Sequence, residues 1–165
     1  MKISKTSIIS WVVIVWICKV FLSSLPYKFA LHPDTQYIFG TIGQWMKDVL
    51  GESIGTLFMN YGAYVVGSVE LFTSFVLLVP ALFFVFIKIG FIDRSPNSHI
   101  IHAVGGALAS SVMAGAMFFH LATPLGIEVI HEGQSDGGSL FYAAVSIFVL
   151  GALMAVINLM KYKKG

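Results

Sequence analysis

Charge and cysteine are both scarce in this chain of 165 residues, and each shortage excludes a class of protein. Only 11% of the residues are charged, whereas 57% are hydrophobic, and a soluble domain of this length needs far more charge to cover its surface. The net charge of +2 gives no basis for nucleic-acid binding. A single cysteine, Cys18, excludes self-contained dithiol exchange, because that reaction needs two thiols. No repeat, phosphate-binding glycine loop or soluble catalytic domain is visible.

Long hydrophobic runs take the place of the missing charge. Three runs are plain, at residues 8–25, 100–123 and 140–160, and a fourth at 61–92 is interrupted only by Glu70, Pro80 and Lys88. Each is long enough for the roughly 20 residues that cross the hydrocarbon of a bilayer. The first run lacks a small-residue cleavage site, which favours a retained span over a signal peptide. We therefore expect an all-α membrane protein, a single four-transmembrane-helix bundle with spans at about 7–25, 61–92, 100–123 and 139–160.

Charged residues are distributed unevenly about these spans. If the N-terminus lies inside, the basic residues on the inner side are Lys2, Lys5, Lys88, Arg94, Lys161, Lys163 and Lys164, whereas the outer side has Lys28 and Lys47. Cytoplasmic loops of membrane proteins are enriched in lysine and arginine. This bias predicts a multi-pass protein of the bacterial inner membrane with both termini in the cytoplasm.

The outer loop at residues 26–60 is the one sizeable region outside the predicted spans. Its segment TQYIFGTIGQWMKDVLG, at 35–51, has apolar residues with helical spacing. This spacing predicts a short helix lying along the membrane interface, with Tyr37 and Trp45 at headgroup level. Pro26 is expected to mark the end of the first span.

Glu70 is an ionisable residue near the middle of the second span. On a helix, its face is shared by Gly67, Thr73 and Ser74, whereas the opposite face is bulky and apolar. Small and hydroxyl-bearing residues let helices approach closely, so Glu70 should point into the bundle, where an acid is a functional candidate. Lys19, in the first span, has two open interpretations: its stem extends to the headgroups, or it pairs with Glu70.

His120 lies one turn before Pro124 near the end of the third span. Proline has no N–H, so the helix should break there, as commonly happens beside a cavity. Glu70 and His120 are therefore expected to meet in the outer half of the bundle and to relay a proton or hold a polar headgroup. The open alternative is that His120 only bonds a loop carbonyl. No metal site is expected, because the methionines near His120 have the spacing of packing residues.

Small residues recur every fourth position in the third span. They are Ala103, Ala107, Ser111 and Gly115. This spacing predicts a helix-packing seam.

Three segments carry a resemblance to a known family. They are FLSSLPYKFALHP after the first span, GSVELFTSFVLLVP in the second and AMFFHLATPLGI closing the third. In order and topology, the chain resembles the DoxX family of four-helix bacterial membrane proteins. The resemblance matches Lys28, Glu70 and His120 to family positions, whereas Ser24 stands where that family usually has glycine and Lys19 is an extra charge.

The resemblance implies an accessory or quinone-interacting subunit of a redox or thiol–sulfur system linked to oxidative stress. A quinone is the expected ligand, and a redox enzyme or sulfurtransferase is the expected partner, with a homo-oligomer also open. The candidate catalytic residues are Glu70 and His120; the candidate ligand-binding residues are Glu70, His120, Lys19, Lys28, Thr73 and Ser74. The alternative is a non-catalytic membrane scaffold or chaperone. A transporter of small solutes or metals has less support, because no inverted repeat is present.

Overall fold

The fold is a bundle of five helices, described here from a computed structural model that covers residues 5–164. The helices are α1 (Lys5–Phe29), α2 (Pro33–Leu50), α3 (Glu52–Lys88), α4 (Ser98–Ala122) and α5 (Ser139–Lys164). Four of them, α1, α3, α4 and α5, are long and apolar enough to cross a membrane. This confirms the predicted all-α membrane bundle.

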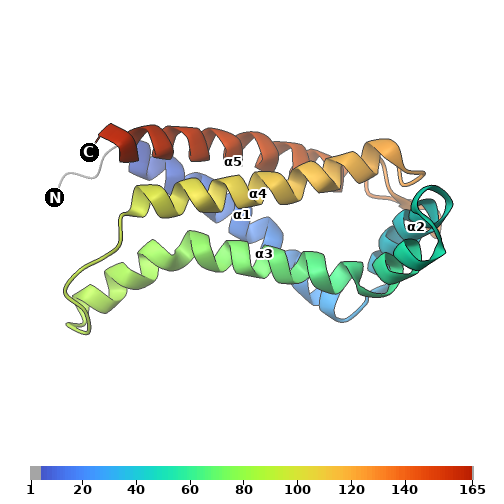
Figure 1. The fold of residues 1–165 in the computed structure, drawn as a ribbon, viewed down its shortest axis with the longest axis horizontal. Coiled ribbons are helices and arrows are strands. Elements are labelled where there is room, and N and C mark those ends of the chain that lie inside the picture. Colours follow the sequence, from blue (N-terminus) through green and yellow to red (C-terminus); the bar gives the residue numbers. More distant parts are fainter. Residues whose placement is uncertain (1–4, 165) are drawn as a thin grey trace.

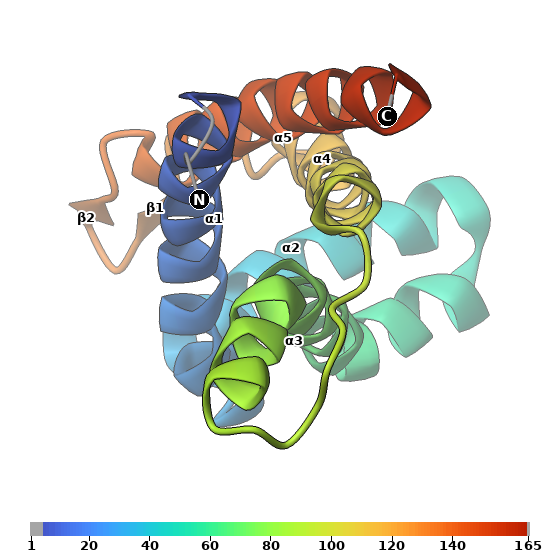
Figure 2. The same ribbon diagram turned by 90° about the vertical axis from the view of Figure 1, so that its left-hand side faces the viewer.

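Helices α3, α4 and α5 run along the length of the bundle, α1 crosses behind them at an angle, and α2 lies at one end (Figures 1 and 2). The beginning of α1, the end of α5 and the connection between α3 and α4 lie together at the opposite end (Figure 1). We call these the α2 end and the terminal end. The acidic residues of the α4–α5 loop, Glu128, Glu132 and Asp136, lie at the α2 end. The basic tail of α5 lies at the terminal end, as does the α3–α4 connection with Asp93 and Arg94.

Two predicted boundaries of the outer loop were wrong. Helix α1 continues through Pro26 to Phe29, because a proline costs a helix one hydrogen bond and need not end it when the flanking turns are held. The hydroxyls of Ser23 and Ser24 donate to carbonyls of the preceding turn, Val20 and Phe21. Helix α3 begins at Glu52, not near residue 61, so helices occupy most of the predicted loop.

The short helix expected at 35–51 is present as α2, at Pro33–Leu50. Its buried face includes Phe39, Ile42 and Gly43, and it packs on the beginning of α3. The two backbones approach closely, because a Cβ on Gly43 would lie 3.0 Å from the Gly55 carbonyl oxygen. Helix α2 is therefore a packed part of the bundle, which a position along the membrane interface alone did not predict.

The loop between α4 and α5 contains a small hairpin that the sequence analysis did not predict. Strand β1 (Ile130–His131) pairs antiparallel with β2 (Gln134–Ser135). The two residues between them, Glu132 and Gly133, have φ values of 51° and 77°, as a type I′ hairpin turn requires. The hairpin holds the loop over the α2 end of the bundle.

Helices α4 and α5 also pack closely against each other. A Cβ on Gly106 would lie 2.6 Å from the carbonyl oxygen of Gly151, and Ser110 donates a hydrogen bond of 2.8 Å to the Phe148 carbonyl. Of the predicted seam, Ala103 is buried, but Ala107 and Ser111 are exposed. That prediction was wrong because the seam lies on a neighbouring face of α4, about 100° around the helix.

Candidate functional site

Glu70 is buried inside the bundle, as its helical face predicts. Its residue surface is 3% exposed, whereas Phe72 and Phe75 on the other side of α3 are each 57% exposed. Bulky apolar side chains toward the lipid and small ones toward the neighbouring helices leave room for a carboxylate within the bundle.

The partner of Glu70 is Lys28, from the last turn of α1. The Lys28 Nζ atom lies 2.5 Å from Glu70 Oε2 and 2.8 Å from Ser24 Oγ. The Ser24 hydroxyl lies 2.9 Å from Oε2, so Oε2 and the Phe21 carbonyl share its one proton. Ser24 and Lys28 share a face of α1 because they are four residues apart. The helix must continue through Pro26 for this spacing to hold. Gly67 on α3 leaves space for the lysine stem, which would lie 3.5 Å from a Cβ there.

Lys19, the other candidate partner of Glu70, faces away from the site. It is exposed, and its Nζ lies 5.6 Å from the ring centroid of Trp16 on the same helix. A cation over an indole face is held by the ring quadrupole. The interpretation that Lys19 pairs with Glu70 was therefore wrong, and the ion pair goes to Lys28.

His120 is buried where α4 ends, and its surroundings fix the proton on its ring. Helix α4 ends at Ala122, just before Pro124, as predicted. The Nδ1 atom of His120 lies 2.6 Å from the carbonyl oxygen of Gly126. Because a carbonyl only accepts, Nδ1 carries the proton, and in the neutral ring Nε2 is an acceptor. The loop-carbonyl bond foreseen as an alternative is thus present, and it still leaves Nε2 with a lone pair.

A cavity of about 650 Å³, which we call the central pocket, connects these groups. Ser24, Lys28, Glu70 and His120 all line it, and no described hydrogen bond joins Glu70 to His120. Most of the remaining lining is apolar and comes from all five helices; α2 contributes Ile38, Phe39 and Ile42. Small-molecule sites commonly have this size and this mixture of an apolar wall with few polar groups.

Thr73 and Ser74 are buried but lie outside the lining of the central pocket. Their hydroxyls donate to carbonyls one turn back on α3, Thr73 to Val69 at 2.8 Å and Ser74 to Glu70 at 2.9 Å. These bonds give each hydroxyl a hydrogen-bond acceptor within its own helix, although the side chains face neighbouring helices. In this structure the two residues pack α3 into the bundle and do not face the cavity.

The loop after α4 places further polar groups around the α2 end of the pocket. Asp34, which lines the pocket, accepts from His131 Nδ1 at 2.8 Å. Burial alone would raise the pKa of Asp136, but backbone N–H donors from Leu140, Val129 and Gly138 and the nearby charge of His120 outweigh burial and lower that pKa. Asp136 therefore fastens this loop to the beginning of α5 as a carboxylate.

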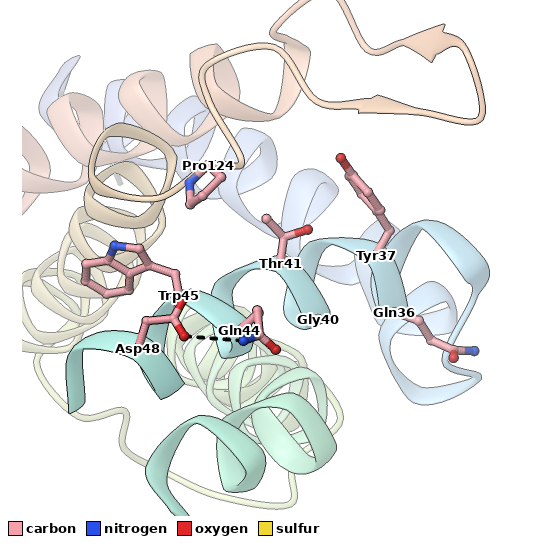
Figure 3. Close-up of a pocket in the computed structure, with 8 residues that line it drawn as sticks. All are labelled: Gln36, Tyr37, Gly40, Thr41, Gln44, Trp45, Asp48 and Pro124. Carbon is pink, nitrogen blue, oxygen red and sulfur yellow. Dashed lines mark hydrogen bonds between the residues drawn. The ribbon is translucent and has the colours of Figure 1, made fainter. Parts of the chain in front are cut away.

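A second hollow lies on the outside of α2 and is separate from the candidate residues. Figure 3 shows Tyr37 and Trp45 at its rim, with Gly40 between them. The Gln44 amide donates a hydrogen bond of 3.4 Å to Asp48. The hollow has a volume of about 500 Å³ and shares no lining residue with the central pocket. Within residues 5–164, no group of three or more histidine, cysteine, aspartate or glutamate side chains is arranged to hold a metal ion.

Several buried polar residues lie toward the terminal end, outside the candidate site, among them His102 and Asn158. His102 is 3% exposed, and its ring packs edge-on against Trp11, with centroids 5.4 Å apart. Its Nε2 has no hydrogen-bond partner among the described residues. The position of His102 four residues into α4, on the face of Gly105 and Gly106, was the available signal for its burial.

No protein-family model, curated protein or solved structure matches this chain.

Proposed function

We propose that this chain is a DoxX-like protein of the bacterial inner membrane that binds a quinone in the central pocket, as an accessory subunit of a redox or thiol–sulfur system. The observation that carries the proposal is Lys28, which is 15% exposed on the wall of an otherwise largely apolar cavity. An ammonium group has three N–H donors. Two of them are used by Glu70 and Ser24, and the third remains for a ligand oxygen.

The charge of the site favours a neutral ligand. Lys28 and Glu70 form a pair without net charge, and an anionic headgroup at Lys28 would also meet the Glu70 carboxylate. A quinone carbonyl needs one donor and brings no charge. The free Nε2 of His120 offers an acceptor for the hydroxyl of the reduced form. In this proposal the electrons come from a partner enzyme, with both termini of this chain in the cytoplasm.

The test compares three purified proteins reconstituted in nanodiscs that contain bacterial quinone. They are the wild type, Glu70→Gln and the control Glu52→Gln, which changes an exposed acid elsewhere on α3. Without the carboxylate, Lys28 loses the charged partner that helps to hold it at the pocket wall. A hydrogen bond to a charged group contributes roughly 1.5–3 kcal/mol, so quinone retained per chain should fall roughly tenfold or more in Glu70→Gln. Mass spectrometry of organic extracts measures it.

The control Glu52→Gln should retain quinone as the wild type does. Circular dichroism establishes that each variant is folded. A folded Glu70→Gln protein with the quinone content of the wild type would contradict the proposal.

The second candidate is a scaffold in which the same cluster only fixes helix register. One observation favours it: Lys28 and Ser24 of α1 both bond to the same oxygen of Glu70 on α3, and these bonds join the two helices. In that case Glu70→Gln lowers thermal stability in detergent or the recovery of a protein partner, and the quinone content does not depend on the substitution.

A further inference from the structure

The central pocket reaches the surface of the bundle between α3 and α4. Val65 and Val69 line it from α3 although they are 60% and 38% exposed. Both valines lie on the side of α3 that faces α4. Val76 is on the same side of the helix, and both Val76 and Leu77 lie next to Gly105 of α4. Ser111 and Gly115 line the pocket from α4 at the same gap. We call this opening the α3–α4 mouth.

The α3–α4 mouth is closed at both of its ends along the helices. Toward the terminal end, a Cβ on Gly105 would lie 2.5 Å from Leu77, so the helices touch there. Toward the α2 end, the rings of Phe58 and Phe119 lie 5.4 Å apart. Between these two contacts, a Cβ on Gly115 would meet no atom within 4 Å. The open space at Gly115 therefore joins the pocket to the membrane-facing surface.

A second opening lies between α1 and α5, and its chemistry differs. Ser23 and Tyr27 line it from α1, opposite Leu140 and Ala143 of α5. Tyr27 lies beside the His32 ring, at a centroid distance of 5.1 Å, so this opening borders the polar α2 end. At the α3–α4 mouth, the hydroxyl of Ser111 is satisfied by a 2.9 Å bond to the Ala107 carbonyl, and the other rim residues are apolar. A hydrocarbon chain fits this apolar mouth better.

We propose that the isoprenoid tail of the quinone leaves the pocket through the α3–α4 mouth, and that Gly115 determines which tails are accepted. This inference rests on the proposed function, because it assumes a quinone ring at Lys28. Any side chain at Gly115 would enter the mouth, since nothing else fills that space. Glycine, which has no side chain, thus leaves room for the isoprenoid tail at this position. A long tail must pass through the α3–α4 mouth, whereas a quinone ring with only a methyl group fits inside the pocket.

The experiment measures the binding of two quinones with the same ring, one with a methyl group and one with a long polyisoprenyl tail. The proteins are the wild type, Gly115→Phe and the control Gly40→Phe. Gly40 is also inside a helix with no atom within 4 Å of a built Cβ, and it lies outside the central pocket. Gly115→Phe should weaken binding of the long-tailed quinone roughly tenfold or more and leave the methyl quinone unchanged. Gly40→Phe should change neither.

The outcomes separate this inference from the proposed function. Unchanged long-tail binding in Gly115→Phe overturns the tail route, and equal loss of both quinones overturns it too, because Gly115 would then border the ring. If the wild type binds neither quinone, the proposed function fails, and the tail route fails with it. Should Gly115→Phe not fold, Val65→Trp narrows the same mouth from α3 at an exposed position, with the same expected selectivity.

Discussion

Toward the terminal end of α4, Gly106 faces the backbone of α5, whereas toward the α2 end Gly115 faces open space in the central pocket. The first glycine allows two helices to approach until a Cβ would overlap the Gly151 carbonyl. The second leaves a gap where a side chain would fit. One helix thus joins a close-packed half to a hollow half. A small residue in a spanning helix can therefore lie either at a close contact between helices or at a cavity. Which of the two occurs depends on what its side of the helix faces.

The largest expected effect comes from filling the close-packed half. In Gly106→Leu, the new Cβ would lie 2.6 Å from the Gly151 carbonyl oxygen and 3.1 Å from the Ala155 nitrogen, which are backbone atoms that cannot rotate away. Because overpacking already costs 1–3 kcal/mol where side chains can adjust, we expect a loss of about 3 kcal/mol or more. Unfolding in mixed micelles titrated with SDS measures the change.

Gly115→Leu is the matched control for this prediction. The same substitution in the hollow half should leave stability unchanged or raise it by up to about 1 kcal/mol, because glycine is a poor residue for a helix interior. Equal losses in the two variants would remove the contrast between the two halves of α4.

An intermediate effect is expected from Lys28→Met, which breaks the ion pair of the hollow half. The Glu70 side chain is 4% exposed and would be left without its cation. Breaking a fully buried pair by removing one partner costs about 3–5 kcal/mol, but Lys28 is 15% exposed on the wall of the pocket, so we expect a smaller loss of about 2 kcal/mol. Replacing both partners with apolar residues is often neutral. The double variant Lys28→Met/Glu70→Leu should therefore recover most of the lost stability in the same titration. A double variant no more stable than Lys28→Met would show that the pair is not the cause.

The smallest effect is expected from Asp136→Ala, in the loop that covers the hollow half. Asp136 accepts from the backbone nitrogens of Val129 and Gly138 at 2.8 and 2.9 Å and from Leu140 in the first turn of α5 at 3.1 Å. Loss of a helix-capping side chain costs about 1 kcal/mol. Thermal unfolding at neutral pH measures this difference.

The acid dependence of the same variant follows from the lowered pKa of Asp136. A carboxyl whose pKa is lower in the folded protein stabilises it fully above the unfolded value, here 3.8, and loses that contribution as the pH falls through the folded pKa. The wild type and Asp136→Ala should thus differ at neutral pH, begin to converge as the pH falls below about 3.8, and become equal below the folded pKa. A difference that persists in acid would contradict a role for the carboxylate.

The sequence was sufficient to predict the spans and the direction of Glu70. Hydrophobic length determines which segments can cross a bilayer, and the contrast between the Gly67 face and the Phe72 face shows where a carboxylate can be accommodated. Both signals are local and periodic, so they can be read from one helix at a time. The position of the break before Pro124 was predictable for the same reason.

The partner of Glu70 could not be derived from helical periodicity. Lys19 and Lys28 are both on α1, and Pro26 made an end of the helix before Lys28 the simpler expectation. The choice depends on how far α1 continues and on the approach of its last turn to Gly67, which is a contact between helices distant in sequence. A cavity beside the break at Pro124 was expected, but its lining could not be derived, because it depends on how α2 packs over the gaps between four other helices. The family resemblance did include Lys28 among the matched positions.

The exposed rim at Val65 and Val69 has a consequence for how occupancy must be measured. These valines are on a helix long and apolar enough to span a membrane, so a molecule entering beside them comes from the bilayer and not from water. For the quinone proposed above, the quantity that sets occupancy is then its mole fraction among the lipids. Under that proposal, adding inert lipid at a constant amount of quinone should empty the pocket, whereas adding buffer should leave it filled.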